Sequence, residues 1–233
     1  MQRLLGAFHK TGTVLWDTIL RSAARECSLK IWQMNDGTIQ DAYDLAFDWH
    51  STKIFSLLQA SQVDARAVFC IRDPRDVIVS GAYYHKVSDE AWLHVPRNDL
   101  GGLTYQQKIN SFANMQECFQ FELKHLGGNT IRNMLKIPFA AQHVLVTRLE
   151  WLVEDSELHE FGRIFEFLEF DAQTANQLKA IARSKSLFSG KVSNPRHVRS
   201  GKPAQYLSEF SPETLALFEQ TFGNAAEVLG YPK

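Results

Sequence analysis

Short apolar runs alternate with amphipathic helical stretches along most of this sequence. The apolar runs that we expect to be strands cover residues 3–8, 29–33, 45–49, 67–71 and 143–147. The stretches with helical periodicity cover residues 13–26, 51–60, 76–86, 104–126, 155–167, 172–185 and 212–229. This alternation is typical of a parallel sheet covered by helices on both faces. The sequence therefore predicts an α/β fold with a central parallel sheet.

Size and composition are those of an ordinary globular protein. The chain has 233 residues, a formal net charge of -1 and 45% apolar residues, including 16 Phe and 5 Trp. This excludes a disordered or a polybasic chain, and it allows a large core without disulfides or metals. No linker or repeat separates two halves, so we expect one domain over residues 1–233.

Cysteine usage and the N-terminus bear on location. Cys27, Cys70 and Cys118 are widely spaced, with no CxxC pair and no Cys/His cluster that resembles a metal site. This pattern fits a reducing compartment and predicts no metal. The first apolar run is too short for a signal sequence or a membrane span. We therefore expect a cytoplasmic protein without a membrane span, unless a targeting segment precedes residue 1.

Charge is unevenly distributed despite the near-zero total. Residues 172–208 contain no Asp or Glu. The same stretch carries seven basic residues, namely Lys179, Arg183, Lys185, Lys191, Arg196, Arg199 and Lys202. An anionic partner and a solvated basic face are both compatible with this charge. Aromatic residues are not interleaved with the basic ones, which argues against nucleic acid as the partner.

The first predicted strand runs through a short polar loop directly into a helix. Such a strand–loop–helix turn points backbone N–H groups and the positive end of the helix dipole at one place, which favours an anion. Gly12 permits close approach of the backbone, Thr11 and Thr13 offer hydroxyls, and Lys10 offers a charge. A polar turn in which Thr13 caps the helix is the alternative. The order differs from a Walker A loop, because Lys10 precedes the glycine, and this disfavours a nucleotide kinase.

A second candidate anion site follows the fourth apolar run. Arg72 comes directly after the run, at the strand end where open parallel sheets bind ligands, and Pro74 starts a helix just beyond it. Arg72 and the hydroxyl of Ser80 could converge on a second phosphate. The alternative is that Arg72 pairs with Asp73 or Asp76 and that Ser80 packs internally.

Taken in chain order with Arg199, Ser200 and Gly201, these segments resemble the three cofactor motifs of the sulfotransferases, which use 3′-phosphoadenosine 5′-phosphosulfate (PAPS). The resemblance extends over nearly the whole chain and implies a P-loop-like sulfotransferase fold. It implies that the 5′-phosphosulfate is held by Lys10, Thr11, Gly12, Thr13 and Val14. It also implies that Arg72 and Ser80 hold the 3′-phosphate, and that Arg199, Ser200 and Gly201 close over it.

The chain departs from the family pattern at three places. Ser200 stands where the family usually has Lys, and Tyr206 stands where a Trp follows. The adenine-stacking Trp of the first motif falls on Leu15, with Trp16 one position later. The dimerisation motif of some cytosolic members is not matched by residues 207–216. No oligomeric state is therefore predicted.

Sulfuryl transfer needs a base for the acceptor's proton and positive charge at the leaving phosphate. Lys10 is the candidate for the charge. His50 follows the third predicted strand, so it should emerge at the same sheet edge and act as the base. The resemblance supports this role, because cytosolic sulfotransferases place their catalytic His at this interval before the mid-chain Arg. The Lys that often stands two residues before that His is Asp48 here, which could tune His50 instead.

Other bases and other functions stay open at this point. The other candidate bases are His9, His85 and His197, and the carboxylate candidates are Asp17 and Glu26. The expected function is transfer of a sulfuryl group from PAPS to a hydroxyl or amine of a small-molecule or carbohydrate acceptor, without a metal. Trp92, His94 and Tyr105 are candidates for lining the acceptor pocket. A non-catalytic nucleotide-binding module and a kinase-like P-loop phosphotransferase are the alternatives.

Overall fold

The computed structural model describes residues 1–36, 42–59, 64–189 and 202–233. The chain divides into two compact units, and each is described by itself below. The sheet unit consists of residues 1–72 and 136–201, and the helical unit consists of residues 73–135 and 202–233. That the two units form one domain stays a prediction.

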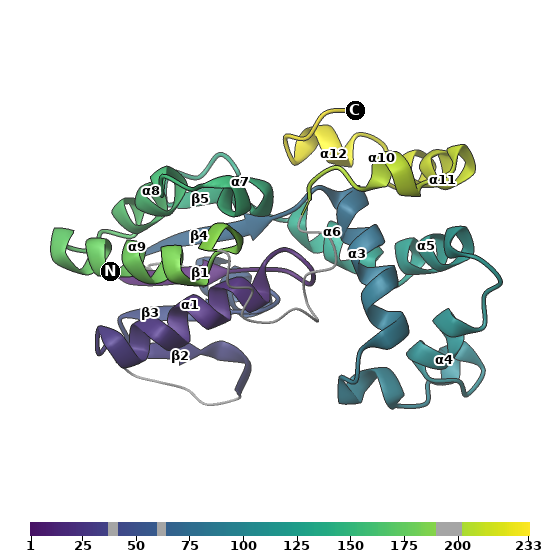
Figure 1. The fold of residues 1–233 in the computed structure, drawn as a ribbon, viewed down its shortest axis with the longest axis horizontal. Coiled ribbons are helices and arrows are strands. Elements are labelled where there is room, and N and C mark those ends of the chain that lie inside the picture. The colour runs from purple at the N-terminus through teal and green to yellow at the C-terminus, as the bar shows by residue number, and fades with distance from the viewer. Residues whose placement is uncertain (37–41, 60–63, 190–201) are drawn as a thin grey trace. The chain divides into compact units, whose positions relative to one another are not determined.

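The sheet unit is built on parallel strands. In the described residues these are β1 (Gln2–Gly6), β2 (Ile31–Gln33), β3 (Leu45–Asp48), β4 (Ala65–Ile71) and β5 (Val144–Arg148). Their order is β2-β3-β1-β4-β5, and every neighbouring pair is parallel, which confirms the predicted α/β fold (Figure 1). Strands β2 and β3 lie on one side of β1, and β4 and β5 lie on the other, so the strand order reverses at β1. Open sheets bind ligands at such a switch point, outside the carboxyl ends of the strands.

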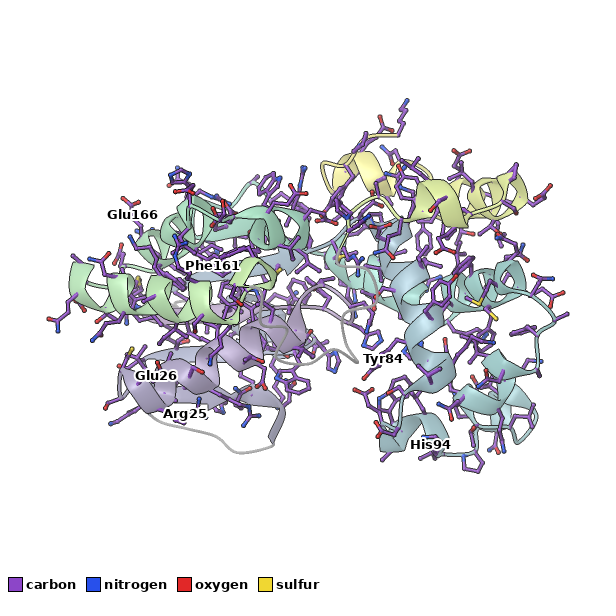
Figure 2. All side chains as sticks on the ribbon, in the orientation of Figure 1. Arg25, Glu26, Tyr84, His94, Phe161 and Glu166 are labelled. Atoms are coloured by element: carbon purple, nitrogen blue, oxygen red, sulfur yellow. The ribbon has the colours of Figure 1, made fainter. Side chains whose placement is uncertain are left out.

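Helices cover both faces of this sheet. They are α1 (Thr13–Glu26), α2 (Thr52–Gln59), α7 (Leu149–Glu154), α8 (His159–Phe167) and α9 (Ala172–Lys185). On one face, apolar residues of the strands form a single buried core with α1, α8 and α9, and Phe161 lies inside it (Figures 1 and 2). On the other face Phe55 of α2 stacks on Phe69, with ring centroids 5.2 Å apart.

The helical unit is organised around one long helix, α3 (Pro74–Val87). Asp73 caps α3 by accepting from the Arg75 N–H, and Pro74 occupies the first turn, where no backbone donor is needed. Three helices that pack on α3 follow it, namely α4 (Tyr105–Asn110), α5 (Met115–Lys124) and α6 (Leu126–Met134). The C-terminal part of the unit contains α10 (Tyr206–Glu209), α11 (Pro212–Phe222) and α12 (Ala225–Val228).

The predicted elements fit the sheet unit better than the helical unit. Helices α1 and α9 have the predicted bounds, and each predicted strand overlaps an observed one. The single helix predicted over 104–126 is wrong, because α4 and α5 occupy that stretch and α6 follows them. Helix α7 was not predicted, and the helix predicted over 212–229 divides into α11 and α12.

Two further observations concern location. Within the described ranges, no helix combines the length and the apolar character needed to cross a membrane. Cys27, Cys70 and Cys118 carry free thiols. A cytoplasmic location stays a prediction.

Candidate functional site

The loop between β1 and α1 is the centre of the candidate site, because it leaves the middle strand at the carboxyl edge of the sheet. Gly12 sits at its end with a φ of 104°, a conformation that L residues rarely adopt. A Cβ at this position would lie 2.9 Å from Cδ1 of Leu149. The backbone conformation therefore favours glycine here, and any larger residue would also have to displace the end of the Leu149 side chain.

The Thr11 side chain is fully buried and holds the loop in shape. Its hydroxyl accepts from the Phe8 N–H at 2.8 Å and donates to the Cys70 carbonyl at 2.8 Å. The Cys70 thiol donates in return to the Thr11 carbonyl at 3.0 Å. Burial raises the pKa of Cys70, so its sulfur keeps the proton that this bond needs. The hydroxyl of Thr11 thus bonds within the protein, and any contact of Thr11 with a ligand stays a prediction.

The start of α1 has the properties of an anion site. Thr13 does not cap the helix, because its hydroxyl donates to the Phe8 carbonyl at 2.9 Å, so the predicted alternative of a Thr13 cap is wrong. Gly12 is the N-cap residue, and in the part of the chain that the structure describes no side chain caps this end. The first N–H groups of a helix have no intrahelical acceptor and carry the positive end of its dipole. Val14 lies in this first turn.

Two of the predicted cations meet at this loop. Lys10 has a φ of 65°, a left-handed conformation that is costly for a non-glycine residue and is common at functional sites. Arg72 follows β4 directly, as predicted, and its Nη1 donates to the Lys10 carbonyl at 3.4 Å. The structure therefore brings Lys10 and Arg72 together, although they lie 62 positions apart in the sequence.

His50 lies at the same edge of the sheet. It follows β3, whose last residue Asp48 is in register with Gly6 at the end of β1. The His50 side chain is exposed, and its main-chain N–H donates to Oδ1 of Asp48 at 3.0 Å. The placement fits a group that meets an incoming substrate, and a catalytic role stays a prediction.

The remaining predicted site residues are Ser80 and the late motif. Ser80 is half-buried on α3 of the helical unit. Arg199, Ser200 and Gly201 lie outside the described residues. Arg75, which the sequence does not single out, forms an ion pair with Asp73. Its Nε donates to Oδ1 at 2.9 Å and its Nη2 donates to Oδ2 at 2.8 Å. The roles predicted for Ser80 and for the late motif stay predictions.

Three other residues singled out in the sequence are buried side chains. His85 and Tyr105 are fully buried in the helical unit, and both contact the carboxylate of Glu122. Trp16 is fully buried against Phe161, with ring centroids 5.7 Å apart, so it belongs to the core. Within the described ranges, no group of three or more His, Cys, Asp or Glu side chains could hold a metal ion.

Comparison with known proteins decides the family. A family model described as "Sulfotransferase domain" matches residues 3–229. The chain belongs to the sulfotransferase family. Among solved structures, a crystal structure of mouse sulfotransferase SULT7A1 complexed with PAP resembles this sulfotransferase with a TM-score of 0.67 and 16% identity. The likeness covers 96% of this chain and 83% of that chain, and it confirms the fold. No curated protein matches this sequence.

Sequence reasoning missed Ser51 and Cys70, which shape the site of this sulfotransferase, and it singled out Asp48 only as a departure from the family pattern beside His50. All three are buried, and their polar atoms bond to main-chain groups of the loops at the sheet edge. In the sequence, Cys70 cannot be told from the other apolar residues of its strand. The signal that could have found the other two is the group of polar residues directly after the third apolar run.

Proposed function

We propose that this sulfotransferase moves a sulfuryl group from PAPS to a hydroxyl or amine of a small-molecule or carbohydrate acceptor. The proposal rests on one observation above all. The start of α1, which no described side chain caps, and the Arg72 guanidinium, which donates to the Lys10 carbonyl, belong to one loop region at the sheet edge. The solved relative whose title names PAP supports PAPS as the donor, because PAP is what remains of PAPS after sulfuryl transfer.

Lys10 and the loop would act on the reacting end of the donor. The acceptor oxygen or nitrogen forms a bond to sulfur while the bond from sulfur to the bridging oxygen breaks, so negative charge develops on the leaving phosphate. Lys10 and the N–H groups of Gly12, Thr13 and Val14 stabilise this charge. Thr11 serves by holding the loop, through the bonds described above.

The proton of the acceptor goes to His50 in this proposal. A neutral imidazole accepts a proton near pH 7, and His50 is exposed at the edge of the sheet. The loop between β1 and α1, residues 7–12, which we call the phosphate loop, leaves the same edge. Arg72 and Ser80, with Arg199, Ser200 and Gly201, would hold the 3′-phosphate. We place the enzyme in the cytoplasm, in keeping with its unpaired cysteines.

The test is transfer of label from sulfur-labelled PAPS to a panel of phenols, alcohols, amines and sugars. Label in an acceptor supports the proposal. Binding of PAP without transfer and without donor hydrolysis would instead identify a non-catalytic module. Tighter binding of MgATP than of PAP would favour the kinase-like alternative. An Arg72→Ala variant should weaken PAP binding in calorimetry by about tenfold or more.

A further inference from the structure

Asp48 is a fully buried carboxylate, and main-chain donors surround it. Oδ1 accepts from the His50 N–H at 3.0 Å. Oδ2 accepts from the N–H groups of Lys53 at 2.7 Å and Ile54 at 3.3 Å. A buried charge is tolerated only when it is paired or well hydrogen-bonded, and these three donors meet that need. Asp48 therefore fixes both the backbone of His50 and the first turn of α2.

The same turn is tied to the start of the phosphate loop. The Asp48 carbonyl accepts from the Ala7 N–H at 3.0 Å. The hydroxyl of Ser51, which is fully buried, donates to the Ala7 carbonyl at 2.7 Å. Ser51 has a φ of 59°, so the chain bends sharply just after His50. The loop that carries His50 and the loop that carries Lys10 are thus joined on both polar groups of Ala7.

We propose that Asp48 is a positioning residue, which holds His50 in register with the phosphate loop without touching substrate. The inference rests on the proposed function, because it takes His50 as the base. An exposed imidazole depends on its backbone for its place, and that backbone depends on Asp48. Misplacement of a reacting group by about 1 Å can cost about 10²-fold in rate.

The chain offers a matched control in Asp155. Its carboxylate accepts from the N–H groups of His159 at 2.7 Å and Phe161 at 3.0 Å, at the start of α8. Three residues after Asp155, Leu158 has a φ of 60°, as Ser51 has three residues after Asp48. Both turns combine a carboxylate that accepts from main-chain N–H groups with a left-handed residue three positions later, although Asp48 is fully buried and Asp155 only half-buried. The Asp155 turn carries none of the predicted site residues.

The experiment compares Asp48→Ala, the milder Asp48→Asn and Asp155→Ala, together with His50→Ala and the double variant Asp48→Ala/His50→Ala. We expect Asp48→Ala to lower kcat about 10- to 100-fold. Its affinity for PAP should stay within about twofold, and Asp155→Ala should keep kcat within about twofold. Because Asp48 acts through His50, the double variant should be no slower than His50→Ala. Asp48→Asn retains one acceptor oxygen and should fall between wild type and Asp48→Ala.

Three results would overturn the inference. They are equal losses of kcat in Asp48→Ala and Asp155→Ala, additive losses in the double variant, or a loss of PAP affinity as large as the loss of kcat. Amide hydrogen exchange of His50 gives a second readout, since loss of the Asp48 acceptor should speed it at least several-fold. If the wild type transfers no sulfuryl group, the proposed function fails. The amide hydrogen exchange rate of His50 still shows whether Asp48 holds the His50 backbone.

Discussion

The sheet unit and the helical unit both bury polar side chains, but they use them differently. In the sheet unit Thr11, Asp48, Ser51 and Cys70 form what we term the loop cluster, and each bonds to main-chain groups of the loops at the sheet edge. In the helical unit a Glu122 cluster joins side chain to side chain. The difference separates residues that shape a site from residues that hold helices together.

The Glu122 cluster links three helices. Oε2 of Glu122, on α5, lies 2.9 Å from Nδ1 of His85 on α3 and accepts from the Tyr105 hydroxyl of α4 at 2.8 Å. Glu122 fits only because Gly81 faces it, since a Cβ there would lie 2.6 Å from Oε1. Burial and the nearby carboxylate raise the pKa of Tyr105, which keeps its hydroxyl a donor. Removing this cluster should therefore cost stability first, whereas damage to the phosphate loop should cost activity first.

The largest effect is expected for Lys10→Ala, which removes charge from the loop without opening a core. Loss of a group that stabilises a developing negative charge typically costs about 10²- to 10³-fold in kcat. Because Lys10 is only half-buried, the unfolding midpoint should hardly move. Steady-state kinetics and thermal unfolding measure both quantities. Lys10→Arg keeps the charge and should retain more activity, and a Lys10→Ala enzyme with near-normal kcat would remove Lys10 from the mechanism.

Glu122→Ala should show the opposite profile. The substitution takes the shared carboxylate away from the buried Tyr105 hydroxyl and His85 ring, and the loss of a buried hydrogen-bond partner costs about 1–3 kcal/mol for each group. Urea unfolding should reveal this loss as a lower midpoint. Glu122→Gln keeps the volume and one acceptor, so it should lose less. An unfolding free energy of Glu122→Ala close to that of the wild type would show that the cluster does not hold the helices.

Gly12→Ala should have a smaller effect, which lowers both the stability of the protein and its affinity for PAP. The left-handed φ costs an L residue about 1–2 kcal/mol, and the contact with Leu149 adds to this. Gly101→Ala is the matched control, because Gly101 has a φ of 66° and a Cβ there meets nothing within 4 Å. Calorimetry with PAP should show weaker binding for Gly12→Ala alone. Equal losses of stability in the two variants would mean that the contact with Leu149 contributes nothing.

The same contrast explains what the sequence could predict. In the sheet unit, the apolar runs and the glycine after the first strand specify elements by local pattern, and α1 and α9 were predicted to the residue. In the helical unit the decisive signals were caps. Asn114 accepts from the Glu117 N–H, and Thr104 forms a capping box with Gln107. Both signals stand in the sequence. Thr104 marks the start of the stretch predicted as one helix, and Asn114 divides it.

Helix α6 and the supports of the site were beyond such reasoning. Gly127 and Gly128 are poor helix formers, so tertiary packing on α3 and α5 must stabilise α6. In the site, the charged residues can be recognised as candidates from their residue type alone. The bonds that place them, such as Ser51 to Ala7 across 44 positions and Thr11 to Cys70 across 59, depend on strand register. The sequence names Lys10, Arg72 and His50 and places Asp48 two residues before His50, but the fold is needed to find the bonds through which Asp48 holds that turn.

The smallest expected effect is a pH dependence in the helical unit. Burial, with the charge of Arg97 as a second cause, lowers the pKa of His125, whose ring lies 4.3 Å from that of Phe121. The unfolded chain therefore binds a proton more readily, and stability falls as the pH drops below about 6.5 toward the lower folded pKa. Urea unfolding at pH 7 and pH 5 should show a smaller difference for His125→Gln than for the wild type. His159→Gln, at an exposed histidine of α8, should leave the difference unchanged. An equal pH dependence in His125→Gln and the wild type would assign the effect to other groups.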